Sequence, residues 1–386
     1  MPEAVIVDAV RTPIGRAFKG SLAQLRPDEM GAFVVDALLE RNPDVDPNSV
    51  EELYCGCGMP QGLQAFNIAR IIALRSEKLP LGVSGATISR YCASSLESIR
   101  QAANAVVAGQ GDTYIAAGVE WVSRYNERTE PAGAADQNER LQGKNGDPDA
   151  YIAMGNTAEN VAERYEVSRA DMDKYAQRSQ ELAVQSQESG YFDREIVPVT
   201  LPDGTVVAKD DGPRASSTLE KLSSLEPAFK EGGSVTAGNS CPLNDGAAAV
   251  LVMSADRAKE LGLKPRARVI TSAVASIEPE YMGVAPIWAI RKVLERAGMT
   301  IADVDTVELN EAFAAQVIPI MSECDIPLEK MNPHGGAIAL GHPFGMTGAR
   351  IMTTLINGLE SDDKTIGLET MCVAGGQGQA RLVERL

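Results

Sequence analysis

The sequence predicts an α/β protein made of two related halves, with a loop-rich segment inserted into the first half. Three observations lead to this prediction: strand and helix patterns alternate, two long stretches of the chain repeat, and a stretch of different character interrupts the first copy. Alternating strands and helices of these lengths are typical of βαβ units, in which helices cover a parallel sheet.

The repeat is long and degenerate. Residues 37–56 (ALLERNPDVDPNSVEELYCG) resemble residues 292–311 (KVLERAGMTIADVDTVELNE), and each stretch predicts an amphipathic helix, a short acidic link and a strand. Residues 91–118 parallel residues 343–371 in the same way, with small residues, a helix, a polar turn and a strand. Two such halves in one chain indicate a duplication.

The interrupting segment does not follow this alternation. It combines a polar stretch rich in Gly, Asp and Asn, a long helix pattern over 157–190 and a second loop-rich stretch. We predict an inserted loop domain of the kind that often covers active sites, with a surface insertion of no function as the alternative. The predicted division is 1–120 and 240–267 for the first core half, 121–239 for the loop domain and 268–386 for the second core half.

Composition restricts the possible partners. The 386 residues include 36 Lys and Arg against 53 Asp and Glu, a formal net charge of −17. This balance argues against nucleic acid as a partner, because binding its phosphates needs clustered basic residues, although it allows a small phosphorylated ligand. No apolar run approaches the ~18–20 residues of a membrane helix, and the first residues lack the features of a signal peptide. We expect a cytoplasmic protein that does not bind membranes.

The six cysteines do not suggest a disulfide framework in a chain of this length. Cys55 and Cys57 have the wrong spacing for a zinc site, and only two histidines could assist, so we expect no metal. We interpret Cys55, Cys57 and Cys324 as structural.

One cysteine stands at the start of a predicted helix. In residues 91–106 (YCASSLESIRQAANAV), apolar residues recur at helical spacing directly after Cys92. The N-terminus of a helix favours a thiolate, because its dipole and free N–H groups stabilise negative charge. The local sequence leaves two interpretations open: Cys92 is a nucleophile, or it is a small buried residue that packs well.

Overlaying the two halves predicts a shared site. Cys92 precedes the helix of the first half and His342 precedes the matching helix of the second, so pseudo-twofold symmetry would bring the two helix N-termini together. Asn310 and Cys372 each end a predicted strand, and ligands of parallel α/β sheets bind beyond the carboxyl ends of strands. An imidazole near Cys92 could accept its proton.

Six segments resemble signature sequences of the thiolase family, the acetyl-CoA C-acetyltransferases and 3-ketoacyl-CoA thiolases. In the order of the family they are RTPIGRAFKGSL, YCASSLESI, TAGNSCPLNDGAAA, NEAFA, GGAIALGHPFGMTGAR and GLETMCVAGGQG. The resemblance implies the thiolase fold, in which two duplicated βαβαβαββ halves form a five-layered α-β-α-β-α core with a loop domain inserted in the first half. It also implies a homodimer or homotetramer, and coenzyme A thioesters as substrates with no permanently bound cofactor.

The resemblance implies a reversible Claisen condensation, in which acyl-CoA and acetyl-CoA give 3-ketoacyl-CoA and CoA. Cys92 would attack the thioester and carry the acyl group, and His342 would accept its proton. Cys372 would remove a proton from acetyl-CoA, so its site must stabilise a thiolate. His342 and a water held by Asn310 would form one oxyanion hole, and the backbone N–H groups of Cys92 and Ala374 the other.

The same resemblance assigns residues to CoA and substrate binding. Arg214 would contact the nucleotide end of CoA. The other assigned residues are Met154, Ala237, Cys241 and Phe313.

The chain departs from the family pattern at several of these places. Ser95 and Ala374 stand where the family commonly has Gly, and Ala153 stands where the acetoacetyl-CoA enzymes usually have His. Cys241 and the following Pro replace a usual Ser-Gly, and we expect a broader 3-ketoacyl preference. His334 replaces an Asn, and we expect it to hydrogen-bond loop backbone.

Two other classes of protein that are related to the thiolases must be compared with this interpretation. Ketoacyl synthases use a cysteine with two histidines and lack the second cysteine, so Cys372 argues against them. A non-catalytic acyl-CoA or lipid-binding protein of the same fold is the alternative function. Such proteins usually lose an active-site residue, whereas all four are present here: Cys92, Asn310, His342 and Cys372.

Overall fold

The computed structural model describes residues 2–124 and 136–386. Its strands are β1 (Ala4–Arg11), β2 (Gly15–Arg16), β3 (Glu52–Gly56), β4 (Ser84–Ile88), β5 (Thr113–Trp121), β6 (Val199–Thr200), β7 (Val206–Val207), β8 (Asn244–Ser254), β9 (Ala267–Ser276), β10 (Thr306–Leu309), β11 (Ile366–Val373) and β12 (Gln377–Arg385). In the described residues, β6 and β7 form a small sheet of their own. The large sheet has the order β10-β11-β12-β9-β1-β8-β5-β3-β4, with β2 paired to β8.

The α-helices are α1 (Pro27–Arg41), α2 (Ile68–Arg75), α3 (Ser94–Val107), α4 (Met154–Arg164), α5 (Arg169–Glu188), α6 (Leu219–Ser223), α7 (Ala255–Glu260), α8 (Pro286–Ala297), α9 (Ala314–Glu323), α10 (Ala337–Leu340) and α11 (Thr347–Ser361). Short 3-10 turns lie at Pro47–Ser49, Gly62–Gln64, Tyr91–Ala93, Glu139–Leu141, Tyr191–Arg194, Pro279–Val284, Ile301–Asp303 and Leu328–Lys330. None of the helices in the described residues is long and apolar enough to cross a membrane.

The order and pairing of the elements repeat, which confirms the predicted duplication. The first half has the order β1-α1-β3-α2-β4-α3-β5-β8. Within the residues that the structure describes, the second half repeats this order as β9-α8-β10-α9-α11-β11-β12, without a strand in the place of β4. β3 pairs with β5 in parallel, as β10 does with β11, and β5–β8 and β11–β12 are both antiparallel. In place of β4, the second half has a parallel bridge between Val307 and Met331.

The sheet is mixed, whereas the sequence patterns predicted a parallel one. In each half one strand runs opposite to the others: β8, between β5 and β1, in the first half, and β12, between β11 and β9, in the second. In the second half only residues 374–376 separate β11 from β12, and Gly375 and Gly376 adopt positive φ angles. A connection this short has no helical crossover, so the next strand must run antiparallel.

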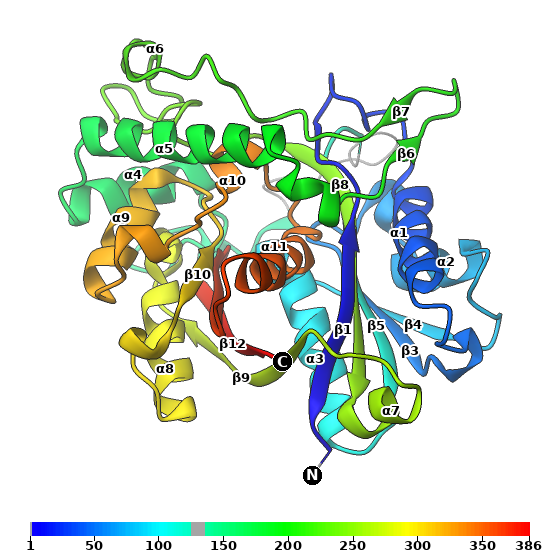
Figure 1. Cartoon of the computed structure of the whole chain (residues 1–386). Coiled ribbons are helices and arrows are strands. Elements are labelled where there is room, and N and C mark those ends of the chain that lie inside the picture. Colours follow the sequence, from blue (N-terminus) through cyan, green and yellow to red (C-terminus); the bar gives the residue numbers. More distant parts are fainter. Residues whose placement is uncertain (1, 125–135) are drawn as a thin grey trace.

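The layers follow from this topology. α3 and α11 lie between the two halves of the sheet, with α1 and α2 on one outer side and α8 and α9 on the other (Figure 1). The halves are joined through β1 and β9 by only two register pairs, Val5 with Arg268 and Ile6 with Ala267. Apolar side chains of α3 and α11 are buried together in one cluster of the core, as the helix pattern after Cys92 predicted.

The inserted segment lies between β5 and β8, over residues 122–243. The helix pattern predicted over 157–190 forms two helices, α4 and α5, instead of one. The chain breaks between them because Glu166 takes a positive φ of 53° and the Ser168 hydroxyl caps α5 by accepting from Asp171 N–H. The domain boundaries at residues 120, 239 and 267 stay predictions.

Candidate active site

Cys92 lies in the 3-10 turn that leads into α3. The Ser94 hydroxyl accepts a hydrogen bond from Arg90 N–H at 2.9 Å and donates one to the Tyr91 carbonyl at 2.6 Å. Tyr91 has a φ of 44°, in the left-handed region, which costs a non-glycine residue on the order of 1–3 kcal/mol. The surrounding contacts therefore hold a strained turn directly before the half-buried Cys92.

The N-termini of α3 and α11 meet, as the overlay of the halves predicted. The backbone N–H of Ala349 donates to the Ser95 hydroxyl at 2.9 Å. A Cβ on Gly348 would lie 2.2 Å from the backbone nitrogen of Leu96, so the helices touch backbone to backbone. Ser95, which departs from the usual Gly, thus satisfies a free N–H at the start of α11.

His342 is buried, and its hydrogen bonds determine its tautomer. The Thr347 hydroxyl donates its single hydrogen to the Pro343 carbonyl at 2.8 Å. His342 Nδ1 lies 2.7 Å from the same oxygen and must therefore be the donor in that contact. Nε2 is left without a hydrogen and accepts from the side-chain amide of Asn310 at 3.2 Å. The imidazole thus presents a basic nitrogen next to Asn310.

A chain of hydrogen bonds connects His342 to Cys372. The Gln316 side chain, on α9, donates to the Asn310 carbonyl at 3.2 Å and accepts from the Cys372 thiol at 3.2 Å. Asn310 in turn donates to His342. All four side chains are buried. The structure therefore brings Asn310, His342 and Cys372 into one site, and it adds Gln316, to which the sequence analysis gave no role.

Cys92 faces the same site. Its turn packs against both β11 and α11. Ala93 and Leu96 share a buried cluster with Met371 and Val373, the neighbours of Cys372. Burial raises the pKa of the Cys92 thiol well above its usual range, and the sulfurs of Cys372 and Cys241 raise it further.

Burial works against the stabilised thiolate that was expected both at Cys92 and at Cys372. Burial lowers the pKa of His342 to about 3, with Arg350 adding to the effect, so the imidazole is neutral. Burial raises the pKa of Cys372 to about 11, so both thiols are protonated at neutral pH. The predicted stabilisation of the Cys92 thiolate by a helix N-terminus is outweighed by desolvation in the substrate-free protein.

The residues assigned to substrate binding fall into two groups. Met154, at the start of α4, and Cys241 pack against the buried cluster that contains Phe313 and Cys372. Cys241 is held there by its N–H, which donates to the Ala312 carbonyl at 2.9 Å. Phe229, which no sequence motif indicated, joins this group: its ring meets that of Phe313 edge-on, with the centroids 6.0 Å apart.

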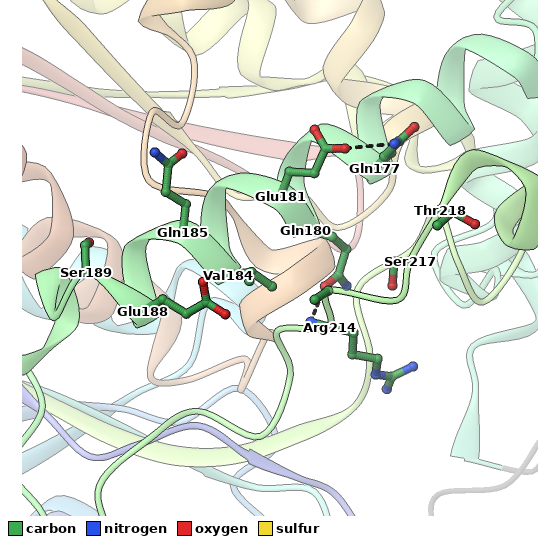
Figure 2. A pocket seen from close by; sticks show the side chains of 11 residues that line it. Gln177, Gln180, Glu181, Val184, Gln185, Glu188, Ser189, Arg214, Ser217 and Thr218 are labelled. Carbon is green, nitrogen blue, oxygen red and sulfur yellow. Dashed lines mark hydrogen bonds between the residues drawn. The ribbon is translucent and has the colours of Figure 1, made fainter.

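Arg214 and Ala237 form the second group and line a cavity of about 280 Å³ together with Pro242, which follows Cys241. A neighbouring cavity of about 580 Å³ lies between α5 and residues 214–218 (Figure 2). The Arg214 backbone N–H donates to Gln180 at 2.8 Å, while its guanidinium points away from α5 (Figure 2). Burial and the nearby Arg16 lower the pKa of Arg214.

Ala374 directly follows β11 and is half-buried. Its carbonyl accepts from the side-chain amide of Gln377 at 3.2 Å. The Gln377 oxygen accepts from Arg90 at 3.1 Å, so the turn after Cys372 is tied to the chain just before Cys92.

Two further residues hold the site in place, and both stand in quoted motifs without an assigned role. The Asn244 side chain accepts from His342 N–H at 3.0 Å and donates to the Gly15 carbonyl at 3.0 Å. Glu311 accepts from Tyr175 and Ser179 of α5 at 2.8 and 2.6 Å, which fixes the inserted segment to the second half.

His334 lies outside the site. Its ring stacks on Tyr191 with the centroids 3.7 Å apart, and its Nε2 has no hydrogen-bond partner in the described part of the chain. The expected hydrogen bond to loop backbone is therefore not formed by this nitrogen. No cluster of three potential metal ligands occurs among residues 2–124 and 136–386.

Two models of known protein families match this chain. The N-terminal thiolase domain matches residues 4–256, and the C-terminal thiolase domain matches residues 263–385. The chain belongs to the thiolase family. It is therefore an acyltransferase that acts on CoA thioesters.

Other thiolases resemble the chain over its full length. A β-ketoadipyl-CoA thiolase of Pseudomonas knackmussii is 44% identical, covering 100% of this chain and 99% of the relative. A 3-ketoacyl-CoA thiolase of Idiomarina loihiensis is 43% identical over 100% of both chains.

Solved structures agree with the thiolase fold. The acetyl-CoA acetyltransferase of Bacillus anthracis superposes with a TM-score of 0.91 at 41% identity, covering 100% of this chain and 99% of that one. The dimeric peroxisomal thiolase of Saccharomyces cerevisiae gives 0.93 at 37% identity, covering 100% and 98%.

Proposed function

We propose that the protein catalyses the reversible condensation of an acyl-CoA with acetyl-CoA to a 3-ketoacyl-CoA, with Cys92 as nucleophile. The observation that carries the proposal is the hydrogen-bonded series Cys372, Gln316, Asn310 and His342 beside Cys92. A nucleophile, a neutral base and a second thiol are the groups that carbon–carbon bond formation next to a thioester needs.

In the first half-reaction, the Cys92 sulfur attacks the thioester carbon while His342 Nε2 takes the thiol proton. The neutral imidazole supports this step, because a histidine with a pKa of about 3 is a free base at neutral pH. Collapse of the tetrahedral intermediate breaks the bond to the CoA sulfur. The leaving CoA thiolate takes the proton of the Cys372 thiol, so acyl-Cys92, the Cys372 thiolate and the His342 imidazolium remain.

In the second half-reaction, Cys372 removes a proton from the α-carbon of acetyl-CoA, and the enolate carbon attacks acyl-Cys92. Cys372 can act as this base because its thiol, protonated at neutral pH in the substrate-free protein, has given its proton to the departing CoA. The Cys92 sulfur then leaves and takes its proton back from the His342 imidazolium as the 3-ketoacyl-CoA forms. Thiolysis is the same sequence in reverse, with Cys372 deprotonating CoA.

Two sets of donors stabilise the oxyanions in this proposal. His342 and a water on Asn310 serve one carbonyl oxygen. The buried Oδ1 of Asn310 has no partner among the described residues and can accept a hydrogen from such a water. The backbone N–H groups of Cys92 and Ala374 serve the other oxygen.

The substrate is a 3-ketoacyl-CoA, which we place in fatty-acid β-oxidation. Arg214 and Ala237 contact the CoA end, and Met154, Cys241 and Phe313 line the way to the thiols, in line with the cavity and cluster that contain them. A second candidate substrate is β-ketoadipyl-CoA, which the names of several relatives favour.

The protein acts as a homodimer in this proposal, as the yeast thiolase is described. β4 ends the sheet, and its side chains are mostly half-exposed. Phe66 is 89% exposed and Leu81 is 76% exposed near this edge. An edge strand beside apolar side chains is suited to pairing with a second copy. A tetramer and the cytoplasmic location stay predictions.

Mass spectrometry after exposure to acetoacetyl-CoA tests the proposed function against the binding alternative. An added acetyl group on the peptide that contains Cys92, absent in Cys92→Ala, supports the thiolase reaction. An unmodified protein that still binds acetoacetyl-CoA would mean a non-catalytic binder. Thiolysis rates on 3-ketoacyl-CoA substrates of about 4 to 16 carbons, with β-ketoadipyl-CoA included, then identify the preferred chain.

A further inference from the structure

Glu120, the next-to-last residue of β5, is a fully buried carboxylate that the proposed mechanism does not use. Its Oε2 accepts from the backbone N–H groups of Gly58 and Gly345, both at 2.7 Å. Its Oε1 accepts from Met59 N–H at 3.2 Å and from the Gln64 side chain at 2.7 Å. These four N–H donors fill the acceptor capacity of one carboxylate, and the Cys57 thiol lies 3.9 Å from Oε1 as a fifth, weaker donor.

These donors come from both halves of the protein. Gly58, Met59 and Gln64 follow β3 in the first half, whereas Gly345 belongs to the second half. Gly345 lies between His342 and Thr347, the two residues whose contact fixes the imidazole. The carboxylate therefore ties the turn that carries the base to the half that carries the nucleophile.

The fit around Gly345 is tight. A Cβ at this position would lie 2.3 Å from the Val119 carbonyl oxygen and 2.7 Å from that of Gly56. The turn therefore rests directly on the ends of β3 and β5, and a glycine is needed for its N–H to reach Glu120.

A second close approach lies on the other side of the turn. A Cβ on Gly58 would lie 2.7 Å from the Cβ of Phe344, whose ring meets that of His342 edge-on at 5.2 Å. The carboxylate also raises the pKa of the Cys92 thiol, after burial and the two neighbouring sulfurs, so it lies close to the nucleophile.

We propose that Glu120 is a positioning residue, which holds the turn bearing His342 in register with Cys92. This inference rests on the proposed function. Its physical reason is that reacting groups must be held within a fraction of an ångström, and a misplacement of about 1 Å can cost on the order of 100-fold in rate.

The test compares a variant that changes the carboxylate itself with a variant that removes one of its donors in the first half. Glu120→Gln keeps the size of the side chain. Its –NH2 group is itself a donor, so it cannot accept hydrogen bonds from the pair of N–H groups that it faces. Gln64→Leu removes a donor to Oε1 and leaves the bond from Gly345 in place. Glu120→Asp, which is too short to reach all four donors, serves if Glu120→Gln does not fold.

We expect Glu120→Gln to lower kcat for thiolysis by about 10- to 100-fold, with KM for CoA within about twofold of the unaltered protein. We expect Gln64→Leu to lower the melting temperature but to keep kcat within about twofold. Glu120→Asp should show the same loss of kcat without a matching change in KM.

Two results would overturn the inference. One is a folded Glu120→Gln or Glu120→Asp protein with unchanged kcat. The other is a Gln64→Leu protein that loses as much kcat as Glu120→Gln at an equal loss of melting temperature. Absence of thiolysis in the unaltered protein would refute the proposed function instead, so the two failures are distinguishable.

Discussion

The hydroxyl of Thr347 lies 2.7 Å from Nδ1 of His342 and donates its own hydrogen to the Pro343 carbonyl. The hydroxyl can only accept from the imidazole, so it keeps the proton on Nδ1 and leaves Nε2 as the base. One side chain thus determines which nitrogen faces Asn310 and the thiols.

Replacing Thr347 tests this relationship. Thr347→Val keeps the shape but removes the acceptor for Nδ1–H, so the tautomer is no longer fixed. We expect the rate of acetyl transfer to Cys92 to fall by about 10- to 100-fold, the usual effect of losing such an outer hydrogen bond. Rapid-quench measurement of acetylation gives this rate directly.

Thr353→Val is the matched control for this prediction. Thr353 is buried in the same helix, and its hydroxyl donates to the Ala349 carbonyl at 2.8 Å. The control should lose similar stability and keep its acetylation rate. Equal rates in the two variants would contradict the role of Thr347.

The thiol of Cys372 should become reactive only at high pH in the substrate-free protein. With a pKa of about 11, its thiolate fraction increases about tenfold per pH unit through the range from 7 to 10. In a Cys92→Ser background, alkylation of the peptide containing Cys372, followed by mass spectrometry, should show this slope. A plateau reached below pH 9 would mean that the site already stabilises the thiolate.

Arg350 and Glu308, two buried groups of the second half, should stabilise each other at a pH where Glu308 is ionised. Arg350 on α11 and Glu308 on β10 are both buried, and the charge of Glu308 raises the pKa of Arg350 against the larger lowering effect of burial. Above the folded-state pKa of Glu308, about 8, Arg350→Met would leave an ionised carboxylate without this partner and should lower the free energy of unfolding by about 3–5 kcal/mol, as measured in urea at about pH 9. The double variant Arg350→Met, Glu308→Gln should recover part of the loss. No recovery would show that the two groups do not interact.

Glu308 should also give stability a specific pH dependence. Burial raises its folded-state pKa to about 8, against about 4.3 in the unfolded chain. Between these values the folded protein retains a proton that the unfolded chain has lost, so the free energy of unfolding decreases as pH increases. Denaturation between pH 5 and pH 8 should show a smaller decrease in Glu308→Gln than in the unaltered protein. Identical slopes would contradict the raised pKa.

The sequence predicted the members of the site better than their environment. Cys92, Asn310, His342 and Cys372 could be found because strand ends and helix starts of a duplicated α/β fold meet at one edge. The hydrogen bonds of Gln316, Thr347 and Glu120 could not be found, because their partners lie far away in the chain or depend on a backbone turn. The single long helix over 157–190 was wrong because a Ser cap and a left-handed residue divide it.

The pKa of the Cys92 thiol could not be predicted from the sequence, for an energetic reason. A helix N-terminus stabilises a charge by about 0.3–1 kcal/mol, whereas full burial shifts a pKa by up to about 3–5 units at 1.36 kcal/mol each. Desolvation is the larger effect, and it depends on how completely distant segments enclose the sulfur. Sequence spacing contains no information on that enclosure.

The central claim is that Cys92 carries the acyl group while Cys372 acts as the base. Single-turnover labelling of the Cys372→Ala variant with radioactive acetyl-CoA tests this claim most directly. In this variant one acetyl group should accumulate on Cys92 and remain there, with no acetoacetyl-CoA formed. Condensation at the unaltered rate in this variant, or a label on any residue other than Cys92, would contradict it.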